Sequence, residues 1–311
     1  ALAGPGACAV TDLPDLFPGF GARSFRTRGA EIFARLGGGG PPLVLLHGYP
    51  QTHAMWHKIA PDLAKNFSLV IPDLRGYGSS SVPGDSPDHF SYSKRAMAQD
   101  VCDIMDALGH QQFLVCGHDR GGRVAYRLTL DEPARVLKLA VLDIVPTCDM
   151  WHKLTPALAL KTFHWTFLAQ PAPWPEKMIG FDPIGWLEDR IWAWNASGPV
   201  FSGQALEHYR AFFSHAERVH ATCEDYRAGA TYDLKADEDD RAAGRKVACP
   251  TLALWGAAGI PGGSGTPVEI WRDWCVDVRG QAIDCGHFLA EEAPAETLAA
   301  LIPFLQGEGK V

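Results

Sequence analysis

A short glycine-flanked segment, Gly117-His118-Asp119-Arg120-Gly121, follows the apolar run Phe113–Cys116. Glycines at this spacing after a strand are typical of a sharp strand-to-helix turn that exposes its middle residue as a nucleophile. Serine is usual at that position, but this chain has Asp119. A carboxylate attacks an electrophilic sp³ carbon and forms an alkyl ester, which water must then cleave. The sequence therefore indicates hydrolysis through a covalent ester on Asp119 and argues against an esterase.

A nucleophile of this kind needs a histidine base, and the histidine comes last in chain order. His287 fits, because it stands beside Gly286 between the last strand pattern and the last helix pattern. The acid that orients it usually follows the next-to-last strand, but no carboxylate occurs between Trp255 and Glu269. Asp143, at the end of the preceding strand pattern, is the better candidate. We therefore predict that Asp119, His287 and Asp143 are the catalytic residues.

Two backbone N–H groups are expected to form the oxyanion site. One belongs to Arg120, directly after the nucleophile, and the other to Tyr49 in His47-Gly48-Tyr49-Pro50. Since water attacks the Asp119 ester, the carbonyl that these donors stabilise belongs to the enzyme itself.

Arg120 and Arg123 lie three residues apart at the start of the helix that follows the turn. Two guanidinium groups in this position could bind a carboxylate bidentately and offset the cost of a second anion beside Asp119. The alternative is that Arg123 pairs with an acid in the core. The first interpretation predicts a carboxylate substrate with its leaving group on the α-carbon.

The elements that must position these residues alternate between strand and helix. Short apolar runs predict buried parallel strands at 41–47, 67–71, 113–116, 137–142 and 250–255, with another near 274–278. Helical patterns cover 54–65, 96–108, the segment from about Gly122 onward, and 294–305. Gly37–Gly40 is expected to be a hairpin loop. This alternation predicts a mostly parallel, doubly wound α/β sheet.

The alternation stops between about Cys148 and Arg241, where prolines punctuate helix-like stretches. We predict a core domain at 1–147 and 242–311, interrupted by a helical cap at 148–241. The charged stretch Lys235–Lys246 is expected to be a solvated return from the cap.

The composition excludes several classes of partner. With 36 acidic and 28 basic residues, the net charge of −8 argues against nucleic acid and anionic membranes. No apolar stretch is long enough to span a bilayer, and the first ten residues lack a signal-peptide pattern; we expect them to be disordered. Eight scattered cysteines without a C-x-x-C pair suit free thiols in a reducing cytoplasm.

The chain resembles the fluoroacetate (haloacetate) dehalogenases of the α/β-hydrolase superfamily from Leu13 to Leu305. The match is carried by eight segments: His47–His53, Asp73–Gly78, Gly117–Arg123, Leu142–Ile144, His164–Trp165, Ala169–Pro173, Cys223–Gly229 and Gly286–Leu289. The first two segments are common across the superfamily. The Gly117–Arg123 segment, together with His164-Trp165 and Cys223–Gly229, is specific to the dehalogenases.

The resemblance implies the α/β-hydrolase fold and the same roles for the triad and the two arginines. It also implies that His164, Trp165 and Tyr226 hold the departing halide, for which an imidazole N–H, an indole N–H and a phenol O–H would be three suitable donors. It further implies a homodimer, a small halocarboxylate substrate, and no cofactor or metal.

The chain departs from the family pattern at Cys148-Asp149-Met150, near the expected pocket entrance, and Trp194 is a weaker candidate for a pocket wall. Either site could change which α-halo acids fit. Three alternatives stay open: an epoxide hydrolase with the same nucleophile and base, a dehalogenase that prefers chloro- or bromoacetate, and a catalytically silent carboxylate-binding protein on this fold.

Overall fold

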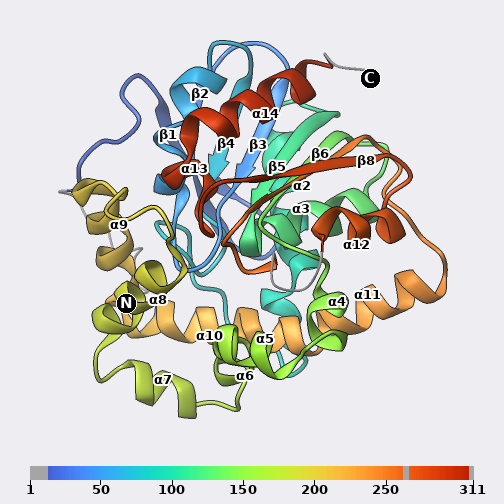
Figure 1. Cartoon of the computed structure of the whole chain (residues 1–311). Helices are drawn as coiled ribbons and strands as arrows, with labels where there is room; N and C mark the ends of the chain where they lie inside the picture. The colour runs from blue at the N-terminus through green and yellow to red at the C-terminus, as the bar shows by residue number, and fades with distance from the viewer. Residues whose placement is uncertain (1–12, 262–265, 308–311) are drawn as a thin grey trace.

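The computed structural model describes residues 13–261 and 266–307, so the expectations for residues 1–10 and Cys8 lie outside it. Its centre is an eight-stranded sheet in the order β1-β2-β4-β3-β5-β6-β7-β8 (Figure 1). The strands are β1 (Gly21–Arg26), β2 (Glu31–Gly38), β3 (Pro42–Leu46), β4 (Ser68–Pro72), β5 (Phe113–His118), β6 (Val136–Leu142), β7 (Thr251–Gly256) and β8 (Val278–Ile283).

The antiparallel pairs join β1 to β2 and β2 to β4, and every neighbouring pair from β4 to β8 is parallel. All six residues of β5 are buried, as expected for a central strand covered on both faces. The predicted mostly parallel α/β sheet is therefore confirmed. The β1–β2 hairpin was not predicted, because most of the β1 side chains are exposed and its sequence has no apolar run.

Helices cover both faces of the sheet. Helix α14 (Pro294–Gln306) packs with α1 (Ala60–Leu63) on one face, and α2 (Lys94–Ala107) packs with α3 (Asp119–Asp131) on the other (Figure 1). Among the helices that lie wholly in the described ranges, those remaining outside the β6–β7 connection are α12 (Pro267–Trp274), α13 (Leu289–Glu292) and two 3₁₀ helices, η1 (His53–Trp56) and η2 (Phe90–Tyr92).

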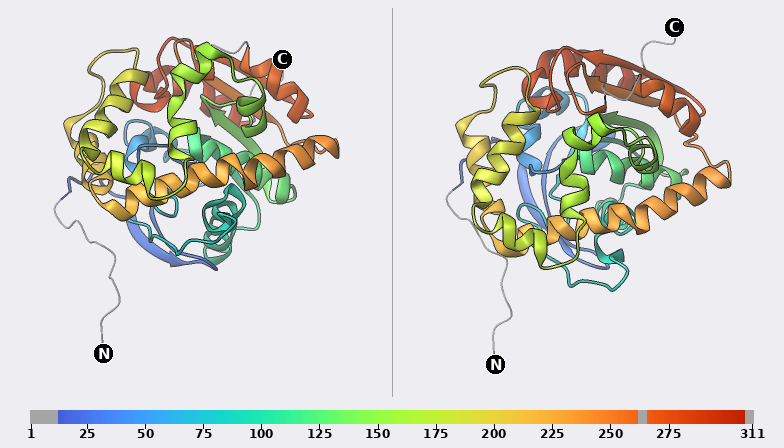
Figure 2. Two further views of the ribbon diagram at one scale, coloured as in Figure 1. Left: turned by 90° about the horizontal axis from the view of Figure 1, so that it is seen from below. Right: turned by 60° about the horizontal axis from the view of Figure 1, so that its bottom comes forward.

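The connection from β6 to β7 contains eight helices, which we call the helical insertion. Figure 2 shows α10 and α11 following one another across it. The helices are α4 (Thr147–His152), α5 (Pro156–Lys161), α6 (Phe163–Leu168), α7 (Trp174–Ile179), α8 (Pro183–Trp194), α9 (Gly203–Phe213), α10 (Ala216–Ala230) and α11 (Tyr232–Ala242). Its role as a separate cap domain with bounds at 148 and 241 stays a prediction.

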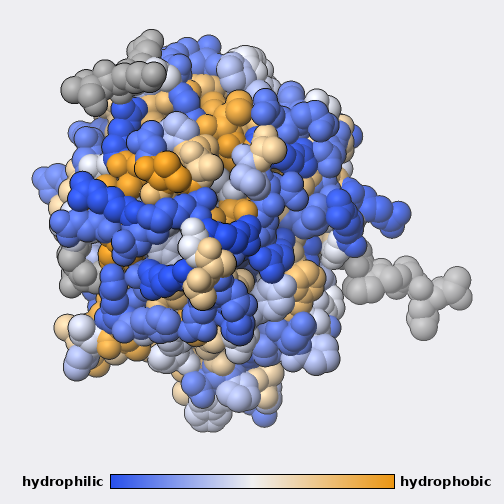
Figure 3. Space-filling view, turned by 90° about the vertical axis from the view of Figure 1, so that its right-hand side faces the viewer, coloured by the Kyte–Doolittle hydropathy of each residue, from blue (hydrophilic) through white to orange (hydrophobic). Residues whose placement is uncertain are grey.

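The interpretation of Lys235–Lys246 as a solvated return is confirmed only in part, since residues 241–246 are exposed but two acidic side chains before them are not. Most of this stretch belongs to helix α11, and two of its carboxylates, Asp237 and Asp240, are buried. Both bind Arg127 of α3, at 3.1 and 2.6 Å. The surrounding face of the molecule, over α11 and α12, is mainly hydrophilic (Figure 3). The charge run therefore has an exposed side and a side that ties the insertion to the core.

Three local predictions also need correction. The strand expected near 274–278 begins at Val278, because Trp271 and Trp274 are buried three residues apart on one face of α12. Gly37 and Gly38 extend β2 and pair with β4, so the glycine run is not a hairpin loop. The helix expected at 54–65 is split into η1 and α1.

The seven cysteines within the described ranges form no disulfide, and six of them are buried. Among the described residues, none of the helices combines the length and the apolar character needed to cross a bilayer.

Candidate active site

The turn between β5 and α3 places Asp119 in the left-handed region, with φ of 45°. A non-glycine residue in this conformation is strained, and such strain is common at functional sites. The turn is closed tightly by its glycines: a Cβ on Gly117 would lie 2.4 Å from the carbonyl oxygen of Gly121. The predicted nucleophile therefore stands on the sharp strand-to-helix turn that the sequence indicated.

The base and its acid meet at the same edge of the sheet, because Asp143 follows β6 directly and His287 follows β8. His287 Nδ1 and Asp143 Oδ2 are 2.6 Å apart. The backbone N–H groups of Gly256, the last residue of β7, and of Ile260, in the loop that follows, donate to the two Asp143 oxygens at 2.9 and 3.0 Å. The loop that lacks an acid of its own thus holds the acid from the neighbouring strand.

The pKa of His287 lies above its ordinary value. Burial would lower it, but the hydrogen bond and charge of Asp143 raise it, and so does the charge of Asp119. Its other ring nitrogen, Nε2, is buried without a hydrogen-bond partner among the described residues. This nitrogen can take a proton from water.

A second histidine, His118, was not singled out from the sequence. Its Nε2 donates to the carbonyl oxygen of His287 at 2.7 Å, and the two rings are 4.5 Å apart. Burial and the neighbouring His287 lower the pKa of His118 to about 3. His118 is therefore neutral and fixes the backbone of the base.

The backbone N–H of Tyr49 donates to Asp119 Oδ2 at 2.9 Å, as expected of an oxyanion donor. The N–H of Arg120 belongs to the first turn of α3, where helix N–H groups lack intrahelical acceptors. Burial would raise the pKa of Asp119, but nearby positive groups, His287 first, lower it below its ordinary value. The nucleophile is therefore ionised at neutral pH.

Arg120 does not present an open fork. Its guanidinium is buried and binds Asp225 of α10: Nε donates to Oδ2 at 3.1 Å, and Nη2 donates to Oδ1 at 2.6 Å and to the backbone oxygen at 2.8 Å. Nη1 is buried without a partner within the described ranges. One nitrogen of Arg120 is thus left for a ligand.

Arg123 is also buried, and no acid pairs with it among the described residues. Its Nη1 donates to the oxygen of Val145 at 2.9 Å and to Thr147 Oγ1 at 3.1 Å, while Nε has no partner in the part of the chain described. The guanidinium lies 4.5 Å from the ring centre of Trp165, a cation–π distance. The alternative that Arg123 pairs with a core acid is wrong.

The three predicted halide ligands lie together on α6 and α10. The ring of Tyr226 is 5.6 Å from His164 and 6.0 Å from Trp165. His164 Nδ1 and the Tyr226 hydroxyl are both buried without partners among the described residues. Burial holds the pKa of His164 well below its ordinary value and that of Tyr226 well above it, so both are neutral.

Trp194, at the end of α8, lies between the predicted halide ligands and the predicted base. Its ring is 4.6 Å from His164 and 5.5 Å from His287. It therefore packs where a leaving group and the base would meet.

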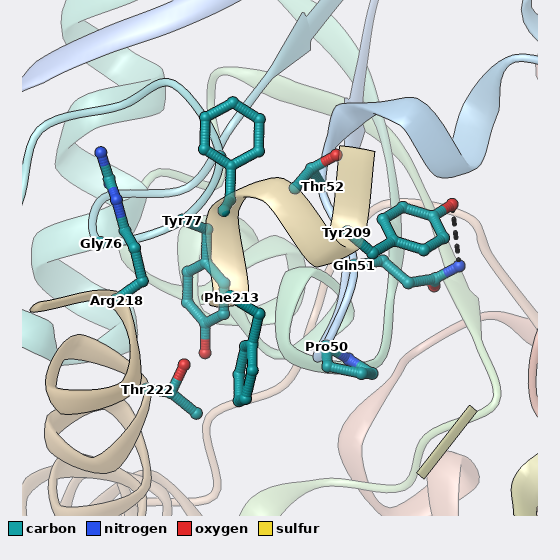
Figure 4. A pocket seen from close by; sticks show the side chains of 11 residues that line it. Pro50, Gln51, Thr52, Gly76, Tyr77, Tyr209, Phe213, Arg218 and Thr222 are labelled. Atoms are coloured by element: carbon teal, nitrogen blue, oxygen red, sulfur yellow. Dashed lines mark hydrogen bonds between the residues drawn. The ribbon is translucent and has the colours of Figure 1, made fainter. Parts of the chain in front are cut away.

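A small cavity lies between the loop residues 50–52 and 76–78 and helices α9 and α10 (Figure 4). Its volume of about 10 Å³ is close to the smallest that can hold one water molecule, so it is too small for a carboxylate substrate. The Tyr77 hydroxyl points toward Thr222 in this view, and it donates to Asp225 Oδ2 at 2.8 Å.

Another group of polar side chains lies apart from these residues. Asp85, His220 and Glu224 have metal-ligand atoms within 4.8 Å of one another. However, His220 already bridges Asp85 and Glu176, at 3.0 and 2.9 Å. The group forms an ion-pair cluster between the core and α7 and α10, and the expected absence of a metal cofactor stays a prediction.

Comparison with known proteins agrees with this geometry. A family model described as alpha/beta hydrolase fold matches residues 41–294. Fluoroacetate dehalogenase from Burkholderia sp is 42% identical over 291 residues, which cover 93% of this chain and 95% of the relative. The chain belongs to the fluoroacetate dehalogenase family of α/β hydrolases.

Other relatives share the fold of this family. Soluble epoxide hydrolase from Corynebacterium sp. (strain C12) is 32% identical, covering 86% of this chain and 91% of the relative. The crystal structure of ALR0039 from Nostoc sp PCC 7120, assigned to the alpha/beta hydrolases, superimposes with a TM-score of 0.90. It is 51% identical, and the match covers 92% of this chain and 98% of that one.

The segment that departs from the dehalogenase pattern, Cys148–Met150, belongs to α4 and is buried. Asp149 binds Arg241 and Trp274 Nε1, at 2.7 and 2.8 Å. The next residue, Trp151, lies 5.6 Å from the ring of Trp165. The segment Cys148–Met150 therefore affects the site indirectly, because the neighbouring Trp151 packs against Trp165.

Proposed function

We propose that this protein hydrolyses the carbon–halogen bond of small α-halocarboxylates, converting fluoroacetate to glycolate and fluoride. The observation that carries the proposal is a carboxylate, Asp119, on a strained turn that is followed by two buried arginines, each with an unpartnered guanidinium nitrogen among the described residues. The 42% identical relative, a fluoroacetate dehalogenase, supports the same substrate class.

In the first step, ionised Asp119 attacks the α-carbon and displaces the halide with inversion. Arg120 Nη1 and Arg123 Nε bind the substrate carboxylate. Fluoride is a poor leaving group in part because its strong hydration must be replaced, and the unpartnered donors of His164 and Tyr226, with the indole of Trp165, replace it.

In the second step, neutral His287, oriented by Asp143, takes a proton from water. The water attacks the carbonyl carbon of the Asp119 ester, and the N–H groups of Tyr49 and Arg120 stabilise the resulting oxyanion. The intermediate collapses, the alcohol oxygen takes the proton from His287, and glycolate leaves. The residues of the chain suffice for both steps.

The second candidate is an epoxide hydrolase. The unpartnered hydroxyl of Tyr226 could protonate an epoxide oxygen, and a 32% identical relative is a soluble epoxide hydrolase. A neutral epoxide would leave the buried guanidinium nitrogens of Arg120 and Arg123 without a partner, which is unfavourable. The homodimer and the cytoplasmic location stay predictions.

Halide release from fluoroacetate and chloroacetate, measured by ion chromatography beside diol formation from a neutral epoxide, tests the proposal. We expect the wild-type protein to release both halides and the Asp119→Asn variant to release neither. Chloride without fluoride would leave the nucleophile in place but contradict the roles of His164, Trp165 and Tyr226. Diol formation alone would refute the proposal.

A further inference from the structure

We propose that Asp225 is a positioning residue, which holds Arg120 so that only Nη1 faces the substrate carboxylate. The inference deepens the proposed function and rests on it for the identity of the substrate. Asp225 lies in the insertion and Arg120 in the core, so the carboxylate site is completed only when the two parts are in contact.

The donor count of Arg120 supports this role. A guanidinium has five N–H groups in a fixed plane. Asp225 accepts from Nε and Nη2 through three contacts of 2.6 to 3.1 Å, which leaves Nη1 unpartnered among the described residues. Tyr226 packs below the guanidinium at 4.1 Å, so the plane cannot turn freely.

The backbone of α10 also limits where Arg120 can lie. A Cβ added to Gly229 would lie 3.0 Å from Nη2 of Arg120. The arginine therefore contacts α10 at both Asp225 and Gly229, one turn apart on the same helix.

A second cation balances the charge of Asp225. Lys94 of α2 is buried and pairs with Asp225 through its ammonium group. The backbone N–H of Lys94 donates to Asp233 at 2.9 Å. The Tyr77 hydroxyl donates a further hydrogen bond to Asp225, at 2.8 Å. Because Lys94 compensates Asp225, the positive charge of Arg120 stays available to an anionic ligand.

The charges then alternate through the buried groups, from Lys94 to Asp225 to Arg120 to the substrate. Removal of Asp225 alone would leave the buried Arg120 without an ion-pair partner and Lys94 with only Asp233, at 3.7 Å, which is strongly destabilising. A test must therefore separate the loss of folding from the loss of positioning.

The double variant Lys94→Met/Asp225→Asn makes this separation, because it removes one positive and one negative charge together. The introduced asparagine is able to accept one hydrogen bond from Arg120 but not a bidentate pair. The matched control is Asp100→Asn: Asp100 also binds an arginine bidentately, Arg75, at 2.7 Å for both contacts, and is buried on the same helix as Lys94.

The measurements are the melting temperature, kcat and KM for fluoroacetate, and the Kd of glycolate by calorimetry. We expect the double variant to fold, with KM and the glycolate Kd raised about 10- to 100-fold and kcat changed much less, since a charge-assisted hydrogen bond is lost from ground-state binding. Asp100→Asn should lower the melting temperature but leave both binding values near those of the wild type.

An unchanged KM and glycolate Kd in the folded double variant would overturn the proposal, and so would equal losses in Asp100→Asn. If the wild-type protein binds glycolate with this pattern of variants but releases no halide, the proposed function fails and the positioning role stands. If the wild-type protein does not bind glycolate at all, the positioning role fails.

Discussion

Replacement of His287 by asparagine should stop the reaction after the first step and leave Asp119 esterified. The asparagine can still contact Asp143, but it cannot take a proton from water. A positioned general base contributes about 10²- to 10⁴-fold, so ester hydrolysis should slow by that factor. The first step should persist, because the charges of Arg120 and Arg123 still act on Asp119 when His287 is removed.

The assay is intact-protein mass spectrometry of the variant after incubation with fluoroacetate. We expect one added carboxymethyl group, and peptide mapping should locate it on Asp119. Fluoroacetate is a better reagent for this assay than chloroacetate. Haloacetates with better leaving groups alkylate thiols without catalysis, and the chain has eight cysteines. The double variant with Asp119→Asn is the control and should stay unmodified.

Two results would refute the reasoning. One is unmodified His287→Asn protein after long incubation, once calorimetry has shown that the substrate binds. The other is modification at a residue outside the turn between β5 and α3, which would mean that Asp119 is not the nucleophile.

Three further predictions concern the halide donor Tyr226, the pH dependence set by His287, and Glu291, a buried residue of α13. Tyr226→Phe should reduce fluoride release by about tenfold or more and chloride release by less, since a donor to the more strongly hydrated halide is lost; equal losses would contradict its role as a halide ligand. Because His287 must be neutral and its pKa is raised, kcat should rise with pH through a value above 6.5. Asp143→Asn should shift this limb of the pH profile to lower pH, and an unshifted limb would mean that Asp143 does not set it. Burial raises the pKa of Glu291 from 4.5 to about 8, so the folded state keeps a proton that the unfolded chain releases, and stability falls by about 1.4 kcal/mol per pH unit between these values. Glu291→Gln should therefore gain melting temperature relative to the wild type on going from pH 6 to pH 8; a constant difference would contradict the raised pKa.

The parts of the site that follow strand ends could be predicted from the sequence. The glycines around Asp119 and the glycine before His287 are local signals, and parallel strands bring their carboxyl ends to one edge. Asp143 could be identified as the acid partner of His287 by elimination, since the loop after Trp255 has no acidic residue. These inferences depend on short-range pattern and on one rule of topology.

The partners supplied by the insertion could not be predicted in the same way. Asp225 and Arg120 are 105 residues apart, and nothing in the local sequence of either links them. The burial of two carboxylates of α11 could not be predicted for a related reason. A run of charged residues is typical of a solvated surface, and only the position of Arg127 shows that two of these side chains are buried ion-pair partners. Helix packing decides both cases.

The two parts of the chain thus divide the chemistry between them. In the proposed mechanism, the core supplies the nucleophile, the base and its acid, and the donors that stabilise the ester intermediate, at or directly after strand ends. The insertion would supply the halide donors and, through Asp225, the orientation of an arginine that itself belongs to the core. Changes in α6 and α10 can therefore alter which leaving group and which anion are accepted while the ester chemistry of Asp119 stays intact. This division gives a physical reason why a dehalogenase and an epoxide hydrolase can both be relatives of one chain at 42% and 32% identity.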